Sequence, residues 1–315
     1  MKRRPSDINL LIAVDKPVGI TSHDAVARVR RALNERRVGH AGTLDPLASG
    51  VMIIGVGQAT RLLGRITLDR KGYLARIAFG SETSTDDAEG EVTRCVAPVS
   101  ELLDSAFAGR VLSGFLGVQQ QVPPAFSAIS VNGVRSYKRA RAGEQVDLPA
   151  RPIEVFSASL IAVEPGSAGE GPIWTVAFDV SKGTYIRALA RDIGRAAGGA
   201  AHLSDLRRTS SGSITLRDCA ELDALDPAGA RARCLDPVAV LGFPAYDLNE
   251  TTLADVLLGR PVFRASCAPR DPALAVSDGV SVALTCAGEL RAIAVADGAR
   301  LRMSDVFPQG IGGVL

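Results

Sequence analysis

Short apolar runs alternate with amphipathic segments along the first 235 residues, and this alternation is the feature that most constrains the fold. Residues 10–14 and 51–56 are apolar runs of the length of a buried strand, and in residues 73–79 every second residue belongs to one apolar face. Residues 22–33 and 186–193 instead have the spacing of an amphipathic helix. This mixture, with some hairpin-like spacings, predicts a mixed α/β domain with a central sheet.

Local signals predict where these elements begin and end. Ser22 and Ser100 are the expected N-caps of two helices. Residues 38–49 are rich in glycine and proline, and residues 81–90 are polar and acidic, so both are expected to be loops.

Prolines within residues 236–244 predict a domain boundary, and a length of 315 residues suits about two domains. Beyond the boundary, short apolar runs separated by Asp-Gly and Ala-Gly turns predict a small β-barrel. The expected domains are residues 1–240 and 241–315. Residues 119–152 are expected to form a long connection inside the first domain.

The sequence argues against a membrane span, a zinc site and a disulfide framework. No apolar stretch approaches the roughly 20 residues needed to cross a bilayer, and no long apolar segment follows the basic N-terminus. The five cysteines are scattered without a C-x-x-C pair, and the three histidines show no metal-binding spacing. We therefore expect a cytoplasmic protein without a metal.

The positive charge is concentrated near the N-terminus. Residues 1–76 hold 14 Lys and Arg against 6 Asp and Glu, although the whole chain has a net charge of only +2. Such an asymmetry indicates a polyanionic partner for this part of the chain.

The region richest in chemical signals is the loop around Asp45. Gly39 and Gly42 precede this residue and allow backbone conformations that other residues resist, while Pro46 pushes Asp45 out of the helical region. Such a loop can present a carboxylate as a nucleophile or a base. From spacing alone, however, a simple Asx turn is the more common role for an Asp-Pro pair in a loop.

Residues 42–46, Gly-Thr-Leu-Asp-Pro, resemble the signature of the TruB family of tRNA pseudouridine synthases. Further blocks similar to motifs of that family follow the same order along the chain. They are residues 15–22, 71–73, 80–90, 181–187 and 202–208. The resemblance implies a pseudouridine synthase fold with a central mixed sheet for residues 1–240. It also implies, less closely, a PUA-like RNA-binding barrel for residues 241–315.

The implied reaction is isomerisation of uridine 55 in the T loop of tRNA. The N1–C1′ bond breaks and a C5–C1′ bond forms, with no oxidation or reduction and hence no cofactor or metal. One carboxylate suffices, and the sequence leaves open whether it attacks C1′ or removes a proton from C2′. The expected partner is tRNA alone, bound by a monomer. The alternatives are a guide-RNA-dependent, dyskerin-like synthase and a non-catalytic tRNA-binding chaperone.

The resemblance implies that Asp45, Tyr73 and Arg187 are the catalytic residues. Arg187 would keep the Asp45 carboxylate ionised, and Tyr73 would stack on the uracil and relay the C5 proton. Without the resemblance, Tyr73 would be a core aromatic, and Arg187 would join Arg191 and Arg195 in a solvated stripe. That solvated role remains the expectation for Arg191 and Arg195.

Five further residues are expected to bind the substrate. Tyr185 and Leu206 match positions that line the base pocket in the family, and His40 matches a histidine that contacts the RNA. Asp87 is expected to bind the uracil edge or to hold the Arg187 network, and Lys16 to contact phosphate or pack its own motif. Each also has a purely structural alternative as a core, loop or solvated residue.

Residues 119–152 contain a basic cluster at residues 135–141, with four Lys or Arg and no acid. The cluster and the N-terminal charge would offset the free energy needed to flip the uridine, through salt-sensitive phosphate contacts. The connection is either a mobile lid that closes on the RNA or a surface insertion.

Overall fold

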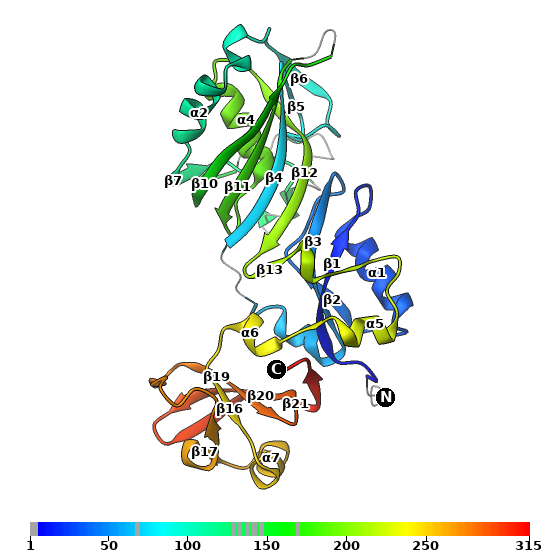
Figure 1. The fold of residues 1–315 in the computed structure, drawn as a ribbon, viewed down its shortest axis with the longest axis vertical. Helices are drawn as coiled ribbons and strands as arrows, with labels where there is room; N and C mark the ends of the chain where they lie inside the picture. Colours follow the sequence, from blue (N-terminus) through cyan, green and yellow to red (C-terminus); the bar gives the residue numbers. More distant parts are fainter. Residues whose placement is uncertain are drawn as a thin grey trace. The chain divides into compact units, whose positions relative to one another are not determined.

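The computed structural model describes residues 6–66, 70–127, 130–131, 134–136, 139, 144, 148–167 and 171–315. The chain forms two compact units. The first comprises Met1–Asp45, Val51–Thr67 and Ser213–Leu315, and the second comprises Pro46–Gly50 and Leu68–Gly212. Both contain parallel and antiparallel strand pairs together with helices (Figure 1). The predicted mixed α/β class is therefore confirmed.

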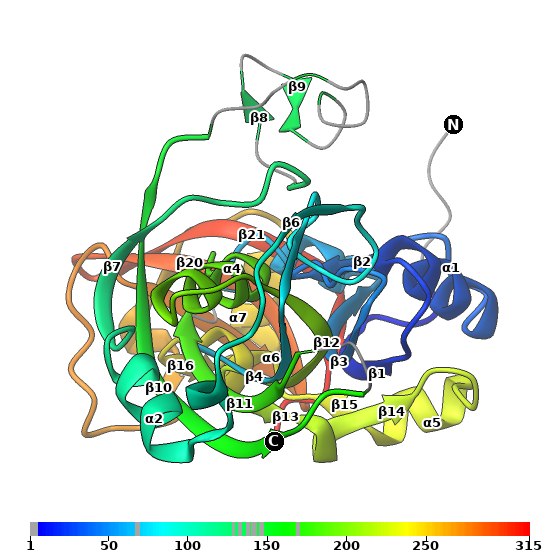
Figure 2. The ribbon, with the colours of Figure 1, turned by 90° about the horizontal axis from the view of Figure 1, so that it is seen from above.

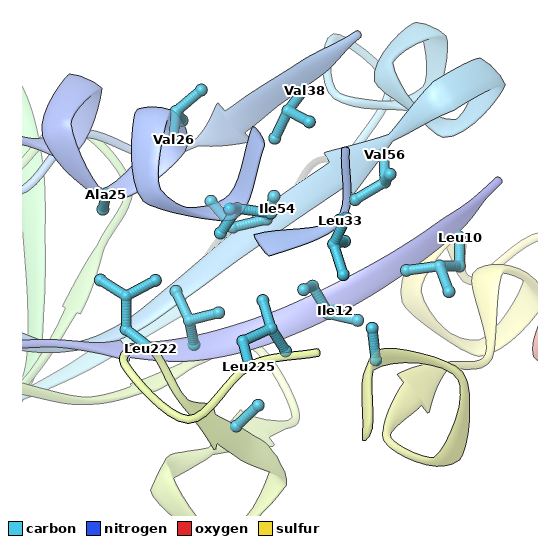
Figure 3. Packing of buried hydrophobic residues seen from close by; sticks show 14 of the residues in the cluster. Leu10, Ile12, Ala25, Val26, Leu33, Val38, Ile54, Val56, Leu222 and Leu225 are labelled. Atoms are coloured by element: carbon cyan, nitrogen blue, oxygen red, sulfur yellow. The ribbon is translucent and has the colours of Figure 1, made fainter. Parts of the chain in front are cut away.

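The first unit is built around strand β1. Its strands are β1 (Leu10–Lys16), β2 (Val38–Ala41), β3 (Ala48–Val56), β14 (Cys219–Glu221) and β15 (Cys234–Leu235). Strand β1 pairs in parallel with β14 and antiparallel with β15, and β2 pairs antiparallel with β3. Helix α1 (Ser22–Ala32) buries Ala25, Val26 and Val29 against this sheet. These three residues belong to one continuous apolar core with Ile12 and Ile54. Figure 3 shows Ala25 and Val26 of α1 together with Ile12 of β1 and Ile54 of β3.

Two local predictions in this unit were wrong. The N-cap of α1 is Thr21, because Asp24 stands at the third helical position and completes a capping box with the Thr21 hydroxyl and backbone. Residues 38–41, expected in a loop, are strand β2, because their backbone pairs with Ile53–Val56 of β3. Tertiary pairing thus overrides the local glycine signal.

The C-terminal part of the first unit is a six-stranded sheet with the order β17-β21-β20-β19-β16-β18. These strands are β16 (Ala245–Asp247), β17 (Val262–Phe263), β18 (Ala268–Pro269), β19 (Ser281–Cys286), β20 (Glu289–Asp297) and β21 (Arg300–Gly312). Helix α7 (Glu250–Leu257) buries Val256 in the same core as Val282 and Leu284. Helices α5 (Pro227–Ala232) and α6 (Pro237–Leu241) precede this sheet in the chain. The predicted β-rich C-terminal region is present as a curled half-barrel.

The second unit is a sheet with the strand order β12-β4-β11-β10-β7. The members are β4 (Arg70–Phe79), β7 (Gly117–Gln121), β10 (Arg151–Glu164), β11 (Ile173–Ser181) and β12 (Ala201–Ser211). Neighbours along this order are antiparallel, and the first three residues of β3 add a parallel pair with β12. Helices α2 (Ser105–Ser113) and α4 (Ile186–Ala196) pack against the sheet. Figure 2 shows β7 beside β10, as the register requires.

The second unit also corrects two expectations about connections. The segment expected to be a polar loop starts with β5 (Ser81–Thr83), which forms a hairpin with β6 (Val92–Cys95). Ser100 begins a short 3₁₀ helix, whereas the carboxylate of Asp104 caps α2 by accepting from the Ala106 N–H.

Both ends of the predicted lid lie at the same edge of this sheet, since Gln121 of β7 is paired with Arg151 of β10. Between them, β8 (Ser130–Val131) and β9 (Val134–Arg135) form a small hairpin. Of the four basic residues of the predicted cluster, Lys138 and Arg141 lie outside the described residues, and Arg139 pairs with Glu144. The lid and its phosphate contacts stay predictions.

No helix in the described part of the chain is long and apolar enough to cross a membrane. All five cysteines are free thiols. The described residues contain no group of three or more His, Cys, Asp or Glu side chains placed to hold a metal ion.

We expect Gly50→Ala to lower the free energy of unfolding by about 3 kcal/mol, since steric strain and a forced backbone shift both contribute. Gly50 has φ +107°, and a Cβ there would lie 2.1 Å from the Arg208 carbonyl oxygen across the β3–β12 pair. Chemical denaturation measures the change. The control is Gly64→Ala, whose Cβ would meet nothing within 4 Å. Equal stability of the two variants would contradict this account of the strand contact.

Candidate functional site

Asp45 follows a tightly fixed piece of backbone in the first unit. Gly42 has φ +80°, a left-handed conformation that the glycine makes accessible. Leu44 is buried, and the Ser22 hydroxyl both accepts from its N–H and donates to its carbonyl oxygen, each at 2.9 Å. Asp45 comes next and is half-buried. The loop therefore presents a carboxylate immediately after a clamped residue.

Ser22 was missed as a site residue because its sequence signal is that of a helix cap. Its side chain is buried and bonds 22 residues away along the chain. Only the similarity of residues 15–22 to a family motif pointed to this segment. The Asp45 loop and this motif are thus one structural assembly.

Lys16 is fully buried at the end of β1. Its Nζ donates to the carbonyl oxygens of Pro17 and Ile20, at 2.8 and 2.7 Å. These two hydrogen bonds favour the interpretation that Lys16 packs its own motif over the interpretation that it contacts phosphate.

His40 lies on β2 and is half-buried. Its ring is 5.8 Å from the ring of His23, edge to face. Of the eight candidate residues, Lys16, His40 and Asp45 belong to the first unit, and the other five belong to the second.

Tyr73 and Leu206 lie on one buried face of the second sheet. Tyr73 is paired with Phe178 of β11 and with Arg208 of β12, and Leu206 is paired with Ala75, two residues along β4 from Tyr73. The predicted face of β4 is confirmed, since Tyr73, Ala75, Ile77 and Phe79 are all buried. The register therefore brings two of the predicted pocket residues together.

The Tyr73 end of this face is cationic. Arg208, only 1% exposed, stands opposite Tyr73. Burial lowers the pKa of Lys71 to about 8, with further contributions from the nearby charges of Arg208 and Lys182. From the sequence, Lys71 and Arg208 could be recognised only as parts of the family motifs. Their burial could not be predicted, because a local sequence pattern does not show whether a charged side chain is buried.

Arg187 is held rigidly at the start of α4 and is 5% exposed. Its Nη1 donates to the Thr85 carbonyl oxygen at 2.9 Å, and its Nη2 donates to the Phe126 carbonyl oxygen at 3.0 Å. The Asp87 carboxylate lies 3.6 Å from Nη1. Asp87 therefore lies beside Arg187. This agrees with the expected alternative in which Asp87 holds the Arg187 network.

The predicted solvated stripe is wrong for Arg191, whereas Arg195 keeps a side chain that is 53% exposed. Arg191 has a side chain only 11% exposed and pairs with Asp86 at 2.8 Å, and Arg195 pairs through two hydrogen bonds with the buried carboxylate of Glu82. Hydrogen bonds from Arg195 are the main cause that lowers the pKa of Glu82. The spacing of one Arg every four residues correctly predicts one helix face. The 81–91 segment covers that face at Arg191 and leaves Arg195 half exposed.

Tyr185 occupies the N-cap position of α4 and is half-buried. Gln121, almost fully buried at the end of β7, accepts from the Tyr185 N–H at 2.9 Å and donates to its carbonyl oxygen at 3.1 Å. This amide clamp fixes the backbone next to Arg187. Sequence reasoning missed Gln121 because the bond spans 64 residues.

Two family models match consecutive parts of the chain. Residues 30–186 match the N-terminal domain of the TruB family of pseudouridylate synthases, and residues 187–238 match the C-terminal domain of tRNA pseudouridylate synthase B. The tRNA pseudouridine synthase B of Mycobacteroides abscessus is 46% identical over 252 residues, covering 80% of this chain and 84% of that protein. The synthase of the same name from Mycobacterium avium is 43% identical and covers 93% of this chain and 94% of that protein.

Solved structures show the same fold at lower identity. An H/ACA RNP bound to a substrate RNA superposes with a TM-score of 0.66 at 23% identity, covering 95% of this chain and 84% of that one. The archaeal box H/ACA Nop10–Cbf5 complex gives 0.65 at 23% identity, with 94% and 85% covered. These likenesses concern the fold alone.

The class defined by these matches is that of the pseudouridylate synthases, which are enzymes. The chain belongs to the TruB family. The resemblance drawn from the sequence motifs is confirmed, whereas the role of each candidate residue stays a prediction.

Proposed function

We propose that this chain isomerises uridine 55 in the T loop of tRNA to pseudouridine, as a monomer without a cofactor, metal or obligate protein partner. Curated relatives that are 41–47% identical carry the name tRNA pseudouridine synthase B, which supports tRNA as the substrate. The positive charge of residues 1–76 supports an RNA partner. The proposed compartment is the cytoplasm, where free thiols such as the five found here persist.

The reaction rearranges one nucleotide without changing its composition. The N1–C1′ bond breaks, the uracil turns, C5 bonds to C1′, the C5 hydrogen leaves as a proton and N1 gains a proton. A single carboxylate near the ribose can begin this sequence by attacking C1′ or by removing the C2′ proton. We propose that Asp45 supplies that carboxylate.

The observation that carries this assignment is the double hydrogen bond between the Ser22 hydroxyl and Leu44. It fixes the backbone directly before Asp45, and a reacting group is most effective when its position is set before the substrate binds.

The other candidates have proposed roles on the same nucleotide. Arg187, fixed by two carbonyl oxygens and by Asp87, would favour the ionised state of a catalytic carboxylate. Tyr73 would stack on the uracil, Tyr185 and Leu206 would line its pocket, and His40 would contact the RNA.

One experiment tests which uridine is modified and whether the chain acts alone: the purified chain is incubated with an unmodified tRNA transcript. We expect one pseudouridine, at position 55, with no guide RNA or second protein added. A transcript with cytidine at position 55 is the matched control and should stay unmodified. Modification only after a guide RNA and partner proteins are added would favour the dyskerin-like alternative, and binding without any modification would favour the chaperone.

A further inference from the structure

Three arginines of α4 each meet a different acid of one short segment, residues 82–87. Arg195 and Arg94 both pair with Glu82. One turn earlier, Arg191 pairs with Asp86, and another turn earlier Arg187 lies beside Asp87. We call Arg187, Arg191 and Arg195 with their three acids the arginine ladder.

The segment held by the ladder has an unfavourable backbone conformation. Asp86 has φ +60°, a left-handed conformation that is rare for a residue with a side chain. The flanking backbone is tied to β12, because Leu203 N–H donates to the Asp86 carbonyl oxygen and Ala88 N–H donates to the Leu203 carbonyl oxygen. Such strain persists only where the surroundings enforce it, and it is common near functional groups.

The strained segment shapes the surroundings of Arg187. Its Thr85 carbonyl oxygen accepts from Arg187 at 2.9 Å, and its Asp87 carboxylate lies 3.6 Å from the same nitrogen. Asp87 is oriented in turn by the Thr85 hydroxyl and by the Glu89 N–H. A shift of residues 84–87 would therefore move the two groups that orient this guanidinium.

We propose that the pairs Asp86–Arg191 and Glu82–Arg195 position Arg187 for catalysis, by holding the 82–87 segment in the one conformation that presents Thr85 and Asp87 to it. These four are positioning residues and act through Arg187, so the inference rests on the catalytic role proposed for Arg187.

The charge of Asp86 has a cost in stability, which argues against a purely stabilising role. Burial raises the pKa of Asp86 to about 6 from 3.8, in spite of the opposing charges of Arg191 and Arg187. The folded state therefore binds the proton more tightly than the unfolded chain. The stability from this group is present below about pH 4 and is lost as pH rises to about 6. Near pH 7.5, the neutral substitution Asp86→Asn should leave the melting temperature unchanged or slightly higher.

The test measures kcat, KM and melting temperature of Asp86→Asn and Glu82→Gln in the full-length chain. We expect kcat to fall about 10-fold or more while KM stays within about twofold, since a small displacement of a catalytic group mainly affects the chemical step. Glu164→Gln is the matched control. It neutralises the acid of another arginine pair in the same unit, with Arg76, and should keep the normal kcat. If Asp86→Asn fails to fold, Glu82→Gln carries the test at the end of the ladder farthest from Arg187.

Arg187→Lys separates this inference from the proposed function. In that background Asp86→Asn should lower kcat no further, because coupled residues are not additive. A large loss in Arg187→Lys, with normal kcat in Asp86→Asn and Glu82→Gln, would overturn the inference and leave the proposed function standing. Additive losses would show that the ladder acts elsewhere, and normal activity of Arg187→Lys would remove the role of Arg187 itself.

Discussion

Asp45→Asn is expected to abolish pseudouridine formation and to leave tRNA binding nearly intact. The amide keeps the size of the carboxylate but can neither attack C1′ nor accept the C2′ proton. We expect the rate to fall at least about 10,000-fold, as for the loss of other essential catalytic groups. Affinity for tRNA should stay within about threefold, because phosphate contacts supply most of the binding free energy. Nucleoside chromatography measures the product, and filter retention measures binding.

The matched control for this variant is Asp223→Asn. Asp223 belongs to the same unit, and its exposed side chain pairs with Arg28 at 2.6 Å, so its loss should leave both rate and affinity unchanged. If Asp45→Asn lost tRNA binding to the same extent as activity, Asp45 would be a binding or folding residue and not the catalyst.

Tyr73→Phe is expected to bind tRNA normally and to stall before the C5 proton is lost. The phenyl ring keeps the stacking surface, which is worth about 1–3 kcal/mol per base. It lacks the hydroxyl that would relay the proton, and general acid–base groups contribute about 100-fold to 10,000-fold to rates. We therefore expect kcat to fall about 100-fold or more with little change in KM. Rapid-quench analysis of the bound RNA should show a rearranged nucleotide that still carries its C5 hydrogen.

Tyr246→Phe is a suitable comparison, because Tyr246 has the same 8% exposure but lies in the core of the C-terminal sheet. Its loss of a hydroxyl should leave kcat normal. Normal turnover by Tyr73→Phe would instead make Tyr73 a packing residue of β4.

The elements that the sequence predicted well are those whose pattern is set by one buried face. The run at residues 10–14, the alternation from Tyr73 and the helical spacing after Tyr185 all correspond to observed elements. The errors concern choices made by distant partners. Strand β2 forms because β3 lies beside it, although its own residues have a weak strand pattern.

The candidate site divides in the same way. The Asp45 loop and the start of the Arg187 helix are each a short continuous stretch of sequence, so each could be identified from its own motif. The groups that hold them in place could not, since Ser22, Gln121 and Asp86 act through bonds that span 22, 64 and 105 residues. Arg191 was wrongly assigned to solvent together with Arg195, because a helix pattern identifies a shared face but not which part of it is covered.

The most direct test of the central claim is the single-turnover rate of tritium release from C5 of uridine-labelled tRNA, with enzyme in saturating excess. Binding differences then cannot contribute, so the rate reports the chemistry alone. The account predicts that Asp45→Asn releases tritium at least about 10,000-fold more slowly than the unaltered chain. Release within tenfold of the normal rate would contradict the assignment of the reaction to the Asp45 carboxylate.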